Sequence, residues 1–208
     1  MEIAAIAAKA PVIPVLTIER AADAVPLARA LVKGGLPVLE ITLRTEAALE
    51  ALRLIAAEVR DAVVGAGTVL NTPQLRQAIH AGARFVVSPG CTPALAQTLK
   101  ASGVPFLPGV QTVSEAMALT EEGFQLLKFF PADTSGGLGW LKAMAAPLAG
   151  LTFCPTGGVN AETAPAYLAL GNVACVGGSW VAPKEAVAAG DWARIERLAA
   201  AASALKRP

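Results

Sequence analysis

Two charged side chains stand inside apolar stretches that are typical of buried strands. Glu40 lies within VLEITLR at residues 38–44, and Lys128 lies within LLKFFP at residues 126–131. Almost all other charged residues fall in helical or loop stretches, where water can solvate them. An unpaired ion in a buried strand is costly. Glu40 and Lys128 are therefore the first candidates for chemistry.

A buried carboxylate and a buried amine can serve two purposes. They can form an ion pair that only stabilises the interior. Alternatively, burial favours the neutral form of an amine, which can attack a carbonyl carbon and form a Schiff base, and a nearby carboxylate can then transfer protons. The second interpretation makes Lys128 the nucleophile and Glu40 the general acid/base.

Two polar side chains follow the ends of neighbouring expected strands. Arg44 comes directly after the strand that carries Glu40, and Thr68 follows the next strand, in GAGT at residues 65–68. A lone arginine at a strand end is often only a rim residue. Beside a buried Glu40 and Lys128, however, Arg44 offers the fork of N–H donors that fits a substrate carboxylate, and Thr68 adds a neutral hydroxyl.

Two glycine-rich turns follow the last two expected strands. The first contains Gly157 and Gly158, and the second contains Gly177, Gly178 and Ser179. Either turn alone can be no more than a tight bend. In a barrel of alternating strands and helices, however, the loops after strands seven and eight form the usual phosphate site. There, backbone N–H groups bind the anion, and no lysine or arginine is required.

Apolar runs that alternate with helical stretches would position these residues. Apolar runs without a period of two are typical of parallel strands buried on both faces. The expected strands are residues 12–16, 38–43, 62–66, 85–88, 105–108, 126–130, 152–155 and 174–176, and the expected helices are residues 20–33, 46–60, 73–81, 93–102, 114–122 and 161–170.

Eight strand–helix units in 208 residues predict a (β/α)8 or TIM barrel near the lower size limit of that fold. An open doubly wound sheet is the rival fold. That fold carries a glycine-rich turn after its first strand, and PVLT at residues 14–17 contains no glycine. No linker or shift in composition divides the chain. We therefore expect one α/β domain over residues 1–208, with its site at the carboxyl ends of the strands.

The composition argues against several classes of function. Hydrophobic residues make up 54% of the chain and charged residues 16%, which predicts a large core. A net charge of +1 without a basic run gives nucleic-acid binding no electrostatic support. The longest uncharged stretch, residues 163–183, is interrupted by Pro165 and by glycine-containing turns, so we expect no membrane span.

The histidine and cysteine counts narrow the chemistry further. The single histidine, His80, is expected on a helix surface, so a histidine-based zinc site or a Ser-His-Asp triad is not expected. The three cysteines lack metal-ligand spacing and fit reduced thiols. The first residues carry Glu2 where a signal peptide has lysine or arginine. We expect a cytoplasmic protein without a metal site.

Six segments, in order along the chain, together resemble a known enzyme family. They are LEITLRT at 39–45, GAGTV at 65–69, SPG at 88–90, KFFP at 128–131, CPTGG at 154–158 and GGSW at 177–180. They resemble the 2-keto-3-deoxy-6-phosphogluconate (KDPG) aldolases, also known as 4-hydroxy-2-oxoglutarate (KHG) aldolases. The resemblance implies a class I aldolase of the Entner–Doudoroff pathway, built as a homotrimer of (β/α)8 barrels without metal or other cofactor.

The resemblance also implies a role for each matching residue. Lys128 matches the Schiff-base lysine and Glu40 the general acid/base. The matches for substrate binding are Arg44 and Thr68 at the pyruvate carboxylate, Pro89 beside that pocket, and Thr156. The matches for phosphate binding are Gly157, Gly158, Gly178 and Ser179. One position departs from the family pattern, because Asp133 stands where a glutamate is expected.

Three alternatives stay open at this point. The chain could be the related aldolase for the galactonate epimer of KDPG. It could be a phosphosugar isomerase or decarboxylase on the same barrel, which needs no Schiff base. It could also be a barrel that binds a phosphorylated ligand without turnover, in which case a buried Lys128 would have no use. Trapping a Schiff base with borohydride separates the last two from an aldolase.

Overall fold

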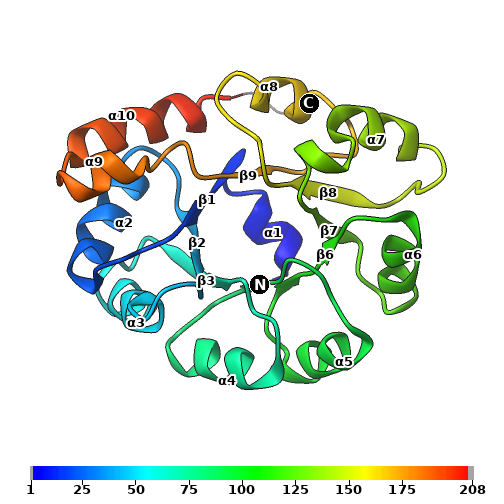
Figure 1. Cartoon of the computed structure of the whole chain (residues 1–208), viewed down its shortest axis with the longest axis horizontal. Coiled ribbons are helices and arrows are strands. Elements are labelled where there is room, and N and C mark those ends of the chain that lie inside the picture. The colour runs from blue at the N-terminus through cyan, green and yellow to red at the C-terminus, as the bar shows by residue number, and fades with distance from the viewer. Residues whose placement is uncertain (1, 206–208) are drawn as a thin grey trace.

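Parallel strands occupy the middle of the protein, and helices lie around them in a ring (Figure 1). The structure is a computed structural model and describes residues 2–205. Nine strands in this range form two sheets, one of six strands in the order β5-β4-β3-β2-β1-β9 and one of three in the order β6-β7-β8. Their bounds are β1 Val12–Leu16, β2 Val38–Thr42, β3 Val63–Gly67, β4 Val86–Val87, β5 Phe106–Leu107, β6 Gly109–Val110, β7 Leu126–Phe129, β8 Thr152–Pro155 and β9 Val176–Gly178.

The two sheets adjoin one another at both edges. Only Pro108 separates β5 from β6, so one run of chain pairs with β4 before the proline and with β7 after it. At the other edge, isolated parallel bridges join Phe153 to Val173 and Thr156 to Gly177. The predicted α/β fold with parallel strands is confirmed. The ladders, however, form two sheets rather than the single closed sheet of eight strands that the sequence suggested.

The helices follow the strands in the expected alternation, and local signals fix their ends. The side chains of Asn71, Thr92 and Thr112 each accept a backbone N–H in the first turn of a helix. The bounds are α1 Ile3–Ala7, η1 Ala21–Asp23, α2 Ala24–Lys33, α3 Ala48–Glu58, α4 Thr72–His80, α5 Pro93–Ser102, α6 Val113–Glu121, η2 Asp133–Ser135, α7 Gly137–Met144, α8 Ala164–Leu168, α9 Lys184–Ala188 and α10 Trp192–Ser203.

Alternation along the strands divides the buried apolar residues into two clusters. The outer cluster fills the space between strands and helices, and includes Leu39, Ile41 and Leu127. The inner cluster lies between the strands themselves and consists of Ile6, Ala7, Ile13, Val38, Val63, Phe85, Val87, Leu107, Leu126, Cys154 and Cys175. The inner cluster contains the first residues of several strands, so α1 packs over their amino ends. The carboxyl ends remain for a site.

The structure differs from the sequence expectations at a few elements. β9 begins at Val176 and runs through both glycines, two residues later than expected, because Gly177 and Gly178 pair with β1. α1, α7, α9 and α10 were not expected. No helix in residues 2–205 is long and apolar enough to cross a membrane.

Candidate active site

The Glu40 carboxylate and the Lys128 ammonium form a buried ion pair. Lys128 Nζ donates to Glu40 Oε1 at 3.1 Å, and the two side chains are 3% and 4% exposed, Glu40 being the less exposed. The Lys128 Nζ also lies 5.2 Å from the centroid of the Phe130 ring. The two charges that the sequence singled out therefore meet, and a proton can pass directly between them.

Strand alternation brings both side chains into the same interior. On β7, Leu126 belongs to the inner cluster and Leu127 to the outer cluster, so Lys128 points inward. On β2, Val38 belongs to the inner cluster, and Glu40 follows it by two residues. Both charged residues lie nearer the carboxyl ends of their strands than these apolar neighbours. Glu40 and Lys128 therefore lie at the end of the inner cluster that is nearest the carboxyl ends of the strands.

Arg44 and Thr68 also meet, beyond the ends of β2 and β3. Arg44 Nε donates to Thr68 Oγ1 at 3.0 Å, and Arg44 makes no ion pair with any residue of the described range 2–205. Thr68 has φ of 59°, in the left-handed region, and is a β-branched residue, for which this conformation is strained. Strain of this kind concentrates at functional sites. Here the strained backbone presents the hydroxyl to Arg44.

Hydrogen bonds between β1 and β2 hold the loop that carries Arg44. Thr42 Oγ1 donates to the Leu16 carbonyl at 2.9 Å and lies 3.1 Å from Thr17 Oγ1. Beyond the strand, the Arg44 backbone N–H donates to the Thr42 carbonyl at 2.8 Å. The guanidinium therefore projects from a backbone that is fixed on both sides.

A cavity of about 490 Å³ opens at the carboxyl ends of the strands. This volume is in the usual range for small-molecule sites. The predicted site residues that line it are Arg44, Lys128, Thr156, Gly157, Gly158, Gly178 and Ser179. Glu40 and Thr68 are not in the lining, but each contacts a residue that is. The structure thus gathers nine of the ten predicted positions around one cavity.

The tenth position, Pro89, lies close by without lining the cavity. A side chain on Gly109 would collide with the Pro89 carbonyl, so Pro89 packs against β6. Gly109 is the register partner of Lys128. Pro89 therefore lies beside the strand next to the lysine. On the other side of the site, Thr156 is buried, and its hydroxyl fills the space above Gly177.

The two glycine-rich turns need glycine for different reasons. Gly157 and Gly158 have φ of 94° and 81°, which side chains rarely adopt. A side chain on Gly158 would also collide with Asp133, the residue at which the sequence departs from the family pattern. Gly178 lacks a positive φ, but a side chain there would collide with the Trp180 ring. Protein atoms, rather than open space for an anion, lie where these side chains would be.

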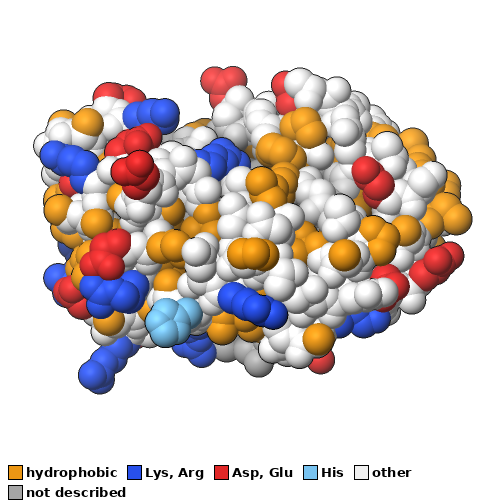
Figure 2. All heavy atoms as spheres, turned by 60° about the horizontal axis from the view of Figure 1, so that its bottom comes forward, with side chains coloured by type: hydrophobic (Ala, Val, Ile, Leu, Met, Phe, Trp, Pro, Cys, Tyr) orange, Lys and Arg blue, Asp and Glu red, His pale blue; other side chains and the backbone are white. Residues whose placement is uncertain are grey.

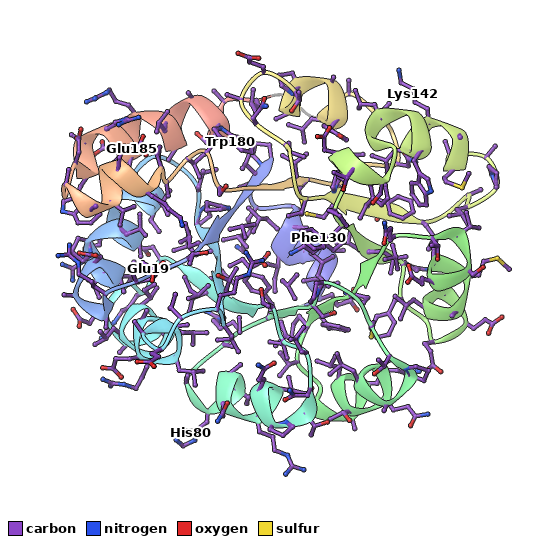
Figure 3. The ribbon with its side chains drawn as sticks, viewed as in Figure 1. Glu19, His80, Phe130, Lys142, Trp180 and Glu185 are labelled. Carbon is purple, nitrogen blue, oxygen red and sulfur yellow. The ribbon has the colours of Figure 1, made fainter. Side chains whose placement is uncertain are left out.

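Sequence reasoning missed several residues that line the cavity, among them four polar or aromatic ones, namely Thr17, Phe130, Trp180 and Lys184. Phe130 lies near the middle of the ring of elements and Trp180 at its inner edge, whereas His80 and Lys142 point away from it (Figure 3). Phe130 could have been found, because it follows Lys128 by two residues and shares its face. Lys184 could not, because α9, on which it stands, was not predicted.

Most of the remaining titratable groups lie on the surface, whereas the buried Cys154 Sγ lies 3.9 Å from the Oγ1 of Thr156, which lines the cavity. His80 is exposed at the end of α4, and acidic and basic side chains are interspersed over the outer helices on the face seen in Figure 2. Within residues 2–205, no three His, Cys, Asp or Glu side chains are close enough to hold a metal ion. The chemistry that this site offers is that of an amine, a carboxylate and an arginine.

Comparisons with known proteins agree with this description. The sequence model of the family described as KDPG and KHG aldolase matches residues 3–198. The KHG/KDPG aldolase of Escherichia coli is 49% identical over 189 residues, which cover 91% of this chain and 89% of that protein.

Two solved structures are also similar over almost the whole chain. The KDPG aldolase of Legionella pneumophila, with pyruvate captured at low pH as a covalent carbinolamine intermediate, has a TM-score of 0.96 and 45% identity, and the match covers 98% of this chain and 99% of that one. The KDPG aldolase of Zymomonas mobilis with 3-phosphoglycerate has a TM-score of 0.95 and 50% identity, covering 99% and 96%.

Proposed function

The chain belongs to the KDPG and KHG aldolase family, and we propose that it cleaves KDPG reversibly to pyruvate and glyceraldehyde 3-phosphate through a Schiff base on Lys128. The observation that carries this proposal is the ion pair of Lys128 and Glu40, buried at the base of a cavity. The relative with pyruvate captured as a carbinolamine supports it, because a carbinolamine is the adduct of an amine with a ketone. The same reaction on KHG would give pyruvate and glyoxylate.

The reaction begins when Glu40 takes a proton from the Lys128 ammonium and the resulting amine attacks the C2 ketone of the substrate. Glu40 then returns this proton to the C2 oxygen, which leaves as water and gives an iminium ion. Glu40, directly or through water, removes the proton of the C4 hydroxyl. The C3–C4 bond then breaks, its electrons move into an enamine, and glyceraldehyde 3-phosphate leaves as the aldehyde. Glu40 returns a proton to C3 of the enamine, and hydrolysis of the iminium releases pyruvate and free Lys128.

Arg44 and Thr68 bind the carboxylate of the 2-keto acid in this proposal. The Arg44 guanidinium faces the cavity with its other N–H groups while Nε is held by Thr68 Oγ1 at 3.0 Å. A planar fork of donors suits a carboxylate. Thr156 contacts the substrate from directly after β8, and Pro89 shapes the pocket indirectly, by packing behind the strand next to Lys128.

We propose that the phosphate binds at Gly157 and Gly158, in the turn after β8, and at Gly178 and Ser179, at the end of β9. All four line the cavity. Lys184 lines it as well and is exposed at its rim, so it adds a cation that the sequence alone did not place there. The Zymomonas mobilis relative, which holds 3-phosphoglycerate, supports a site for a phosphorylated three-carbon acid in this fold.

We propose that catalysis needs no metal or other cofactor. The carbinolamine in the Legionella pneumophila relative supports this, because the iminium itself withdraws electrons and replaces a Lewis acid. Activity should persist after treatment with EDTA. Activity that is lost on chelation and restored by a divalent ion would refute this part of the proposal.

The proposal also covers the barrel architecture, the oligomeric state and the location of the protein in the cell. We propose that the two sheets act as one (β/α)8 barrel in a single domain, which the continuity of β5 with β6 and the bridges to the β9 region support. The resemblance to the aldolase family supports a homotrimer, which light scattering after size-exclusion chromatography would test. The free thiols of Cys91 and Cys154 support a reducing, cytoplasmic location.

The substrate is tested by a coupled assay of pyruvate release. We expect the highest kcat/KM with KDPG, a lower value with its C4 epimer, and a lower value with KHG, which lacks the phosphate. Higher kcat/KM with the epimer than with KDPG would show that the chain is the related aldolase for the galactonate epimer. Release of pyruvate from none of the three would refute the proposed function.

A further inference from the structure

Gly67 is the last residue of β3, and it lies on the inner face of the strand. Val63 belongs to the inner cluster, so Gly65 and Gly67 face the same interior by alternation. Gly67 is the register partner of Thr42, and Gly65 is the register partner of Glu40. Gly67 therefore lies two residues nearer the carboxyl end of β3 than Gly65, which is opposite Glu40.

The Glu40 carboxylate occupies the space that a side chain on Gly67 would need. A Cβ at this position would approach Glu40 Oε1 most closely and would lie 2.6 Å from Cγ and 2.7 Å from Cδ. Oε1 is the same oxygen that accepts the hydrogen bond from Lys128 Nζ. Gly67 has no left-handed φ, so its backbone conformation does not require glycine. Glycine is required there because the Glu40 side chain occupies the space that a Cβ would need.

We propose that Gly67 is a positioning residue for Glu40, because the missing side chain lets the carboxylate lie flat against β3 and face Lys128. The inference rests on the role proposed above for Glu40. With Gly67 on one side and the Lys128 ammonium on the other, Oε1 has little freedom to move. A methyl group at residue 67 would push the carboxylate off this position and separate it from Lys128.

The other inward-facing glycine of β3 provides a contrast. A Cβ on Gly65 would collide with the Phe85 ring, which is fully buried in the inner cluster. A ring in a close-packed core cannot move aside, so Gly65→Ala strains the core. The end of a glutamate side chain can rotate away. Gly67→Ala should therefore change the chemistry more than the stability, and Gly65→Ala the reverse.

The test compares Gly67→Ala with Gly65→Ala in three measurements. These are the free energy of unfolding, the trapping of pyruvate on Lys128 by borohydride, and the exchange of pyruvate methyl protons with solvent. Exchange requires a positioned acid/base, whereas imine formation does not depend on it to the same extent. We expect Gly67→Ala to fold, to trap pyruvate, and to lose at least about 10-fold in exchange rate, with a lower kcat for KDPG and little change in KM.

Removing the side chain beyond Cβ should remove the collision. Glu40→Ala has no atom at the positions of Cγ, Cδ or Oε1, so Gly67→Ala should cost far less of the residual exchange in the Glu40→Ala background than in the wild type. A structure of Gly67→Ala should show Glu40 Oε1 farther than the present 3.1 Å from Lys128 Nζ. A merely structural glycine would give equal losses in both backgrounds.

Several results would overturn the inference. These are an unchanged exchange rate in Gly67→Ala, an equal loss in folded Gly65→Ala, additive losses with Glu40→Ala, and failure of Gly67→Ala to fold. Failure of the wild-type protein to trap pyruvate would refute the proposed function instead. In that case, the distance in the variant structure still decides whether Gly67 positions Glu40.

Discussion

Glu40 and Lys128 are 88 residues apart in the chain, yet Lys128 Nζ donates to Glu40 Oε1 at 3.1 Å in an almost fully buried pair. A buried ion pair adds little stability over an apolar pair, because desolvation offsets the attraction, but removal of one partner leaves an uncompensated charge. The pair can therefore be a structural contact or a reacting pair. The cavity next to this ion pair, and the absence of a side chain at Gly67, favour a reacting pair.

Glu40→Gln separates the two interpretations. Glutamine keeps the shape and can still accept a hydrogen bond from Lys128, but it cannot take up a proton. We expect pyruvate still to form an imine on Lys128, while methyl-proton exchange falls by about 10²–10⁴-fold. Proton NMR in deuterated water measures the exchange. Full exchange in a folded variant would make Glu40 only a structural partner.

Thr68 has a strained backbone conformation that places its hydroxyl within hydrogen-bonding distance of Arg44. A left-handed conformation costs most residues about 1–2 kcal/mol and glycine almost nothing. Thr68→Gly should therefore be more stable than Thr68→Ala by about 1 kcal/mol in chemical denaturation. Both variants lack the hydroxyl, so both should raise KM for KDPG by about 2- to 10-fold. Equal stabilities would contradict the strain, and an unchanged KM would remove Thr68 from the carboxylate site.

Lys184 should matter most for phosphorylated substrates. It is exposed, and its attraction for an anion is screened by salt. We expect Lys184→Ala to raise KM for KDPG by about 2- to 5-fold at low ionic strength and by less at high salt. KM for KHG, which has a distal carboxylate in place of the phosphate, should change less. Lys142→Ala is the matched control, because Lys142 points away from the ring of elements (Figure 3). An equal effect of both variants would exclude a local role for Lys184.

The Cys91 thiol should be unreactive in the folded protein. Burial, and to a smaller degree the charge of Glu122, raise its pKa from 9.0 to about 11. Between these values the unfolded thiol loses its proton and the folded one keeps it, so the free energy of unfolding should fall as pH rises through this window. At pH 8 the folded thiol has on the order of 100-fold less thiolate.

Iodoacetamide labelling at pH 8, with and without denaturant, measures this difference. The Cys91→Ser variant is the control, since it should lose less stability between pH 9 and 11. Equal labelling rates for folded and unfolded Cys91 would contradict the raised pKa.

Much of the site could be predicted, because it breaks the pattern of its surroundings. A charge inside an apolar strand, as at Glu40 and Lys128, is visible in the sequence whatever the fold. Arg44 and Thr68 were predictable because parallel strands bring their carboxyl ends to one edge. Gly67 was not, since an alternation pattern does not show which side chain fills the space of a missing one.

The fold departed from expectation where local preference and tertiary pairing disagree. Glycines favour turns, so residues 177–178 were expected to end a strand, but pairing with β1 makes them part of β9. Gly137 and Gly139 have low helix propensity, so α7, which contains both, was not predicted. At Pro108 the chain changes partner from β4 to β7, and that division between two sheets depends on contacts that no local pattern encodes.

Borohydride reduction in the presence of pyruvate shows whether Lys128 forms the Schiff base. We expect loss of KDPG cleavage together with a stable three-carbon adduct on the peptide that contains Lys128, found by mass spectrometry. Lys142 and Lys184 should stay unmodified, and Lys128→Arg should carry no adduct. An adduct on either of the other lysines, or none at all, would show that Lys128 is not the nucleophile.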